Sequence, residues 1–119
     1  MGSSDLLTVD VDARGSAVVV AVRGELDLAT VPVLRDRLDS VAELSAAPSP
    51  LAVDLSGVTF IGSAGLALLV ELHNTCRERG IPMALVATGS VVLRAIHVTA
   101  LDQVFSVHAS LADALGEKG

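Results

Sequence analysis

The sequence predicts an α/β protein with a mixed sheet, in which an N-terminal β-hairpin is followed by parallel strands and about four helices. The chain begins with an alternating apolar pattern, and apolar strand-like runs then alternate with segments of helical periodicity. Its 119 residues suffice for one hydrophobic core and are too few for two. We therefore expect a single domain over residues 1–119, with its core at about 6–115.

The first two strands are expected to form the hairpin. Val9, Val11 and Ala13 alternate with aspartates, which is typical of a half-buried strand. Residues 14–16 supply a turn, and residues 17–22 are apolar on both faces, as in a central strand covered from two sides.

A first helix is expected after residues 24–27, where the period changes. Thr30 is placed to cap it, and Pro32 falls in its first turn, where a missing amide hydrogen does no harm. Apolar residues then recur at spacings of four and three, at Leu34, Leu38 and Val41. Residues 46–50, with two prolines, end this helix.

The middle of the chain predicts a strand and a second helix. Residues 51–55 are a short apolar strand, and residues 58–61 continue it after a turn or bulge at Ser56-Gly57. Ser63 stands at the expected N-cap of a helix that Gly80 terminates.

Four shorter elements complete the prediction. Residues 83–87 form a buried strand, Ser90 caps a third helix, residues 104–107 form a last strand, and Ser110 caps a terminal helix.

Composition excludes several classes of function. The chain has 14 acidic and 8 basic side chains and a formal charge of -6, which disfavours binding to a phosphate backbone. Two Phe and no Trp or Tyr leave almost no surface on which bases could stack. Cys76 has no second cysteine to pair with, and neither a membrane span nor a basic, hydrophobic leader is evident. We expect a soluble, cytoplasmic protein.

Ser63 is the most informative candidate site residue. It lies between a strand and a helix among the small residues Gly62, Ala64 and Gly65, so another molecule can approach the backbone closely. A phosphate on Ser63 would lie at a helix N-terminus, which favours anions. The alternative is an ordinary N-cap serine, which is what a serine at such a position usually is. A hydrolase nucleophile is disfavoured because Ile61 replaces the first glycine of the nucleophile elbow, although Asp102 and His108 follow in the expected order.

Other polar residues carry weaker signals. Glu25 and Asp27 follow the central strand and could meet Ser63 at one edge of the sheet, or could be solvated loop acids. His73, His97 and His108 lack metal-ligand spacing, and Cys76 shares an apolar helix face. No dinucleotide or phosphate-binding glycine motif occurs.

Two segments together resemble the STAS domain family. They are Gly24-Glu25-Leu26-Asp27 before the Thr30-capped helix, and Asp-Leu-Ser-Gly-Val-Thr-Phe-Ile-Gly-Ser-Ala-Gly-Leu at residues 54–66. Residues 99–101 resemble a further family segment, and the likeness spans about Val9 to Leu115. The single-domain, SpoIIAA-like anti-sigma factor antagonists are the most similar group.

The resemblance implies a protein-binding switch rather than an enzyme. In that family an anti-sigma factor with serine-kinase activity phosphorylates the serine at the helix start. The unphosphorylated antagonist binds the anti-sigma factor and releases a sigma factor, and a phosphatase restores it. Carried over by motif, Ser63 is the phosphorylation site, Asp27 the neighbouring acid, and the partner-binding residues are Glu25, Asp27, Thr30, Gly62, Ser63, Ala64 and Gly65. A monomer without cofactor, metal, nucleic-acid binding or membrane insertion is implied.

This chain departs from the family motif at two positions. Gly62 replaces the usual aspartate, and Ala64 replaces a second hydroxyl-bearing residue, which leaves Ser63 as the single acceptor in the segment. A second context for the family is a non-phosphorylated STAS subunit of a lipid-transport or stress-sensing complex. An enzyme is the third alternative, and would require turnover that depends on Ser63.

Overall fold

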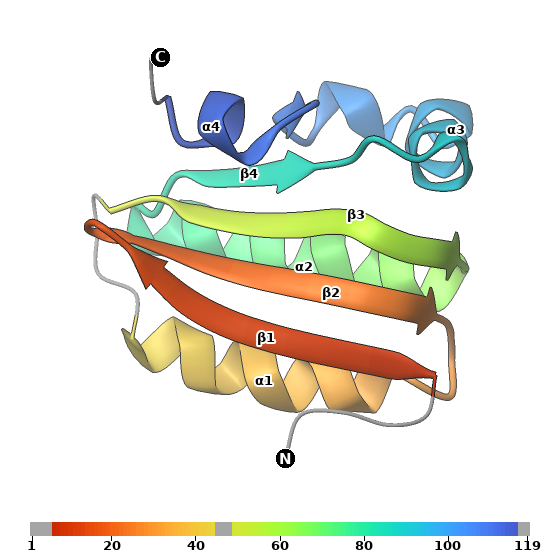
Figure 1. Cartoon of the computed structure of the whole chain (residues 1–119), viewed down its shortest axis with the longest axis horizontal. Coiled ribbons are helices and arrows are strands. Elements are labelled where there is room, and N and C mark those ends of the chain that lie inside the picture. The colour runs from red at the N-terminus through yellow and green to blue at the C-terminus, as the bar shows by residue number, and fades with distance from the viewer. Residues whose placement is uncertain (1–5, 45–48, 117–119) are drawn as a thin grey trace.

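The computed structural model describes residues 6–44 and 49–116, which form one mixed sheet with helices packed against it (Figure 1). The strand order follows the chain: β1 (Leu7–Arg14), β2 (Ala17–Leu26), β3 (Leu51–Ile61), β4 (Met83–Val86) and β5 (Val107–His108). β1 is antiparallel to β2, and all the later neighbours are parallel. The predicted hairpin and the predicted parallel sheet are therefore confirmed.

The core lies between the sheet and two long helices. α1 (Val31–Leu44) and α2 (Ser63–Arg79) lie on the same face of the sheet (Figure 1). Val20 and Val53 of the central strands are fully buried there together with Leu34 and Leu69 of the helices. α3 (Ser90–Val98) packs against β3, and α4 (Leu111–Ala114) packs against β4 and β5 (Figure 1). Four helices are thus present in the described residues, as expected.

Both central strands are longer than the sequence pattern suggested. β2 continues to Leu26 and includes Glu25, which pairs with Phe60 of β3 and so belongs to the strand rather than to the loop. β3 is continuous through Ser56-Gly57, where the register with β2 shifts, so the bulge alternative is correct. Gly24 has φ 109°, and a side chain there would collide with the Leu6 carbonyl, which explains a glycine inside a strand.

The predicted last strand is present but is shorter and later than residues 104–107, because β5 covers only Val107–His108. Residues 104–106 instead follow a 3₁₀ turn at Leu101–Gln103, and the amide of Phe105 donates to the Leu101 carbonyl at 2.8 Å. This turn buries the Phe105 ring against the core, and only Val107–His108 pair with β4. The apolar run reflected burial of a turn, which periodicity cannot distinguish from a short strand.

Helix ends are partly as predicted. Gly80 ends α2 in the left-handed conformation (φ 71°), and the Ser110 hydroxyl accepts the Asp113 amide at 3.1 Å. Ser90 does not cap α3, because Gly89 occupies the N-cap and Ser90 is already helical. α1 ends at Leu44, and residues 46–48 of the predicted terminator lie outside the described residues.

Candidate functional site

The site is formed where β2 and β3 end side by side. Leu26 pairs with Ile61, so the loop to α1 and the start of α2 leave the same edge of the sheet (Figure 1). The amide of Gly62 donates to the Leu26 carbonyl at 3.0 Å and holds the two exits together. Parallel pairing therefore brings Asp27 and Ser63, far apart in sequence, to one place.

The loop between β2 and α1 is closed by its own side chains. The Asp27 carboxylate accepts the amides of Ala29 and Thr30 at 3.0 and 3.2 Å. The Thr30 hydroxyl donates to the Glu25 carbonyl at 2.7 Å and accepts the Asp27 amide at 3.0 Å. α1 begins directly after Thr30, as predicted, but this hydroxyl braces the loop instead of capping the helix.

Ser63 is not the N-cap of α2. Gly62 occupies that position with an extended backbone (φ -99°, ψ -178°) and provides no side-chain cap, while Ser63 is the first helical residue. Ser63 is exposed, and its hydroxyl makes no hydrogen bond within the described part of the chain. The first hydrogen bond of the helix runs from the Leu66 amide to the Gly62 carbonyl at 3.1 Å. The amides of residues 63–65 come before it and therefore have no acceptor within the helix. The hydroxyl is thus presented to solvent at the positive end of a helix of 17 residues.

Gly65 acts inside the protein rather than at its surface. A Cβ there would lie 2.8 Å from Leu26 Cγ and 3.0 Å from the Leu26 carbonyl oxygen and Ile61 Cγ1. Its absence lets α2 approach the strand ends closely, which sets the position of Ser63. Of the predicted partner-binding residues, Thr30 and Gly65 are buried, Ser63 is exposed, and Glu25, Asp27, Gly62 and Ala64 are half-buried.

The structure does not assemble a hydrolase triad around Ser63. His108 Nε2 lies 2.7 Å from the Ser106 hydroxyl, and His97 lies 3.6 Å from the Asp102 carboxylate. Asp102 and His108, the acid and base of the hypothetical triad, therefore contact other residues. This removes the geometric basis for nucleophilic activation of Ser63.

His73 and Cys76, also considered as candidates, pack against other side chains of the protein. His73 packs edge-on against Phe105, with ring centroids 5.8 Å apart. Cys76 is buried, as expected, and burial raises the pKa of its thiol. No group of three potential metal ligands comes together among residues 6–44 and 49–116.

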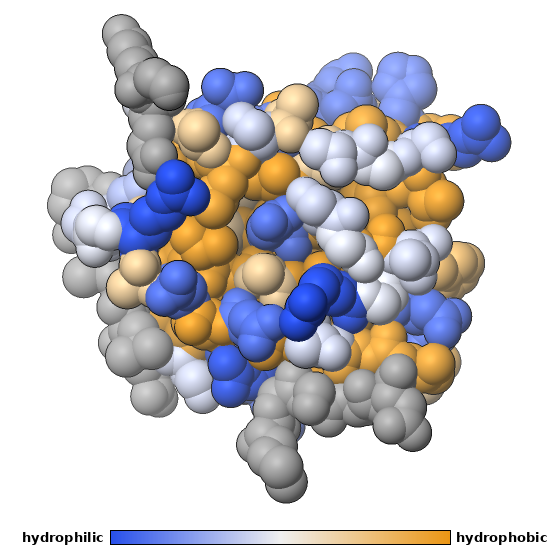
Figure 2. Space-filling model, viewed as in Figure 1, coloured by the Kyte–Doolittle hydropathy of each residue, from blue (hydrophilic) through white to orange (hydrophobic). Residues whose placement is uncertain are grey.

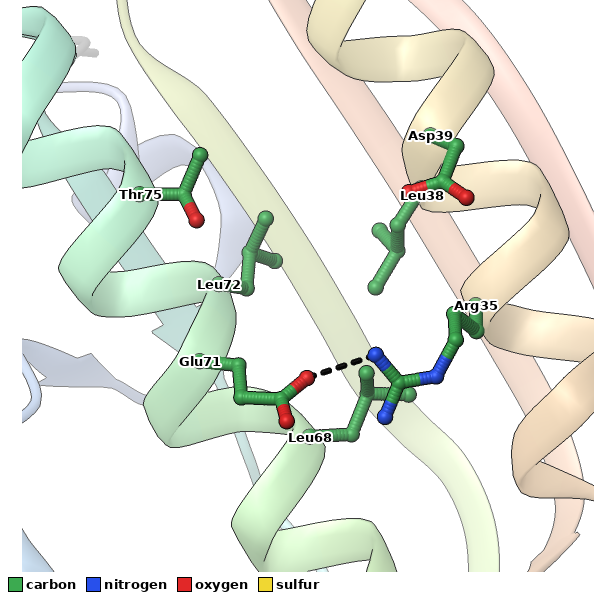
Figure 3. A pocket seen from close by; sticks show the side chains of 7 residues that line it. All are labelled: Arg35, Leu38, Asp39, Leu68, Glu71, Leu72 and Thr75. Atoms are coloured by element: carbon green, nitrogen blue, oxygen red, sulfur yellow. Dashed lines mark hydrogen bonds and ion pairs between the residues drawn. The ribbon is translucent and has the colours of Figure 1, made fainter.

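A shallow groove of about 120 Å³ separates α1 from α2 away from Ser63 (Figure 3). Arg35 of α1 reaches across it and donates to Glu71 of α2 at 2.7 Å. This hydrogen bond and the charge of Glu71 raise the pKa of Arg35. Both side chains are about half exposed, so the pair links the two helices at the surface.

With this geometry established, comparison with known proteins assigns the family. The family model of the STAS domain matches residues 8–114. The chain belongs to the STAS domain family.

Close relatives of this STAS chain are bacterial regulators. It is 34% identical over 112 residues to the anti-sigma-F factor antagonist RsfA of Mycobacterium tuberculosis, covering 94% of this chain and 88% of that one. It is 35% identical over 115 residues to RsfB of the same organism, another anti-sigma-F factor antagonist, covering 97% and 92%. A crystal structure of an anti-sigma factor antagonist from Mycobacterium paratuberculosis superposes with a TM-score of 0.85 at 34% identity, covering 98% and 97%.

Two exposed apolar side chains beside the site were not predicted as binding residues. Leu28 follows Asp27 in the loop, and Phe60 is the last residue but one of β3, two positions before Gly62. A signal for Leu28 is present in the sequence, because it lies in the segment between Asp27 and Thr30 and outside the apolar repeat of α1.

Proposed function

We propose that this STAS chain is an anti-sigma factor antagonist controlled through Ser63. In its unphosphorylated form it binds an anti-sigma factor that has serine-kinase activity and so releases a sigma factor. The observation that carries the proposal is the solvent-exposed, unbonded Ser63 hydroxyl at the start of α2, beside the braced Asp27 loop. The names of the two mycobacterial relatives and of the superposed crystal structure support it.

Phosphorylation would switch binding without refolding the protein. A phosphate on Ser63 adds about 1.5–2 negative charges at pH 7. The α2 N-terminus stabilises this anion through amides that precede the first helical hydrogen bond. The bulk and charge then occupy the surface on which the partner docks, next to Asp27.

The two departures from the family motif define the acceptor. Ala64 carries no hydroxyl, so Ser63 is the single acceptor at the start of α2. Gly62 removes a carboxylate from beside Ser63, so recognition by the kinase and phosphatase depends on Asp27 and Glu25 for local negative charge.

The partner surface combines exposed and internal residues. Ser63 with Gly62, Ala64, Asp27 and Glu25 provides the contact surface. Thr30 and Gly65 act from inside, since both are buried and hold the loop and the helix start in place.

In this role the protein acts as a cytoplasmic, monomeric, single-domain regulator without catalytic activity or cofactor of its own. No helix in the described part of the chain is both long and apolar enough to span a membrane.

The decisive experiment is a pull-down from lysate of the native host with three baits: wild type, Ser63→Glu and Ser63→Ala. Mass spectrometry then identifies the proteins retained. We expect wild type and Ser63→Ala to retain a kinase-type anti-sigma factor and Ser63→Glu to lose it. Incubation with that factor and ATP should add one phosphate to wild type and none to Ser63→Ala.

Two results would contradict the proposal. Equal retention by all three baits would show that Ser63 does not control binding. Recovery of lipid-transport or stress-complex subunits in place of an anti-sigma factor would assign the chain to a structural STAS role.

A further inference from the structure

Leu28 and Phe60 are apolar side chains left at the surface beside the candidate site. Leu28 is 81% exposed, the highest value among the large hydrophobic residues that the structure describes, and Phe60 is 47% exposed. In Figure 2 hydrophobic side chains reach the surface between charged ones, including at the lower right, where Figure 1 places the end of β2.

The backbone carrying Leu28 is held in place. The Asp27 carboxylate accepts the amides of Ala29 and Thr30, so hydrogen bonds close the turn on both sides of Leu28. The buried Thr30 hydroxyl ties the same turn to the Glu25 carbonyl. Leu28 is thus presented to solvent by an ordered loop, which reduces the entropy that binding would cost.

The Phe60 ring lies beside Gly62, and its backbone belongs to a central strand. Phe60 pairs with Glu25 across the two central strands. Its ring lies 3.4 Å from where a Cβ at Gly62 would stand, directly before Ser63. One apolar side chain therefore adjoins each half of the site, Leu28 beside Asp27 and Phe60 beside Gly62.

We propose that Leu28 and Phe60 are the apolar anchors by which the anti-sigma factor binds this chain, seated in an apolar depression of that protein bordered by lysine or arginine. The inference rests on the function proposed above. A few side chains that become fully buried, ringed by contacts that exclude water, carry most of the binding free energy in protein interfaces.

The charge around the anchors selects the partner. Glu25 and Asp27 lie at the same edge, and the chain carries a formal charge of -6, so a basic border is complementary. A second copy of this chain is a poor occupant, because a two-fold interface would bring the same carboxylates of both copies together.

The test measures affinity for the purified anti-sigma factor recovered by the wild-type bait, using isothermal titration calorimetry. The variants are Leu28→Ala and Phe60→Ala, with Val104→Ala as the matched control. Val104 is 42% exposed. It lies three positions before β5, the edge strand, which β4 separates from β3. We expect Leu28→Ala and Phe60→Ala each to weaken binding about tenfold, and Val104→Ala to leave it unchanged.

The contribution of charge to partner binding is measured from the salt dependence of the affinity. Raising salt from about 0.05 to about 0.5 M should weaken binding of wild type, and Glu25→Gln should reduce that dependence. Thermal unfolding of each variant shows that the fold is retained.

The failures are distinguishable. Absence of binding by wild type would overturn the proposed function and the anchors with it. Binding by wild type with equal affinities of Leu28→Ala, Phe60→Ala and Val104→Ala would overturn the anchors alone. A concentration-dependent dimer abolished by Leu28→Ala would replace the partner by a second copy, and a salt-independent affinity would overturn the basic border.

Discussion

The Thr30 hydroxyl donates a 2.7 Å hydrogen bond to the carbonyl of Glu25, five positions earlier in the chain. Thr30 is 3% exposed, so this contact is sheltered from water. It joins the end of a central strand to the start of α1 and encloses the loop that carries Asp27. The geometry of the candidate site thus depends on a buried hydroxyl as well as on the exposed side chains.

Replacing Thr30 by valine should destabilise the protein by about 1–3 kcal/mol. The substitution keeps the shape but leaves the Glu25 carbonyl and the Asp27 amide without the hydroxyl. Urea denaturation measures the change. Thr59→Val is the control, because the exposed Thr59 hydroxyl contacts the Gly24 carbonyl only at 3.4 Å and its loss should cost less than about 0.5 kcal/mol. Similar losses in both variants would refute the role of Thr30.

Gly65→Ala should cost about 1–3 kcal/mol, although alanine normally favours a helix over glycine. The added methyl would lie 2.8 Å from Leu26 Cγ and 3.0 Å from the Leu26 carbonyl oxygen, so α2 must shift. Gly89→Ala is the control, since nothing lies within 4 Å of its Cβ position. Thermal unfolding compares the two, and a Gly65→Ala protein as stable as wild type would mean that this close approach is dispensable.

Gly62→Asp should be more stable than Gly62→Ala by about 0.5–2 kcal/mol. The N-cap of α2 has an extended backbone but no side-chain cap, and an aspartate can accept the free amides that follow. Both variants place a Cβ 3.4 Å from the Phe60 ring, so their difference isolates the cap. Urea denaturation provides the measurement. Equal stabilities would show that the start of α2 gains nothing from a cap.

Stability should fall as the pH rises above about 9 through the titration of Cys76. Burial raises the pKa of this thiol from its ordinary value of 9.0, so the unfolded chain loses its proton first and unfolding becomes more favourable. The chain has no Tyr and a single Lys, Lys118, so few other groups titrate there. Urea denaturation at neutral and alkaline pH should show this slope in wild type. A Cys76→Ala protein with the same slope would assign it to another group.

Local patterns were sufficient for most of the fold. The alternating Val9 and Val11, the uniformly apolar residues 17–22 and the apolar repeat of α1 each depend on which side chains face the core, and periodicity reports this directly. The same patterns misplaced the last strand, since Phe105 is buried by a turn. They also assigned caps to Ser63 and Ser90, where glycine one residue earlier holds the N-cap.

The sequence by itself determined the mixed sheet, its hairpin and the STAS motif with Ser63 at the start of a helix. Only the tertiary structure decided that Ser63 is exposed and is not the N-cap of α2. The same holds for the bracing of the loop by Thr30 and for the exposure of Leu28 and Phe60. The physical reason is that hydroxyl partners and burial depend on contacts between segments distant in the chain. Those contacts arise when β2 pairs with β3 and Gly65 lets α2 close on the strand ends.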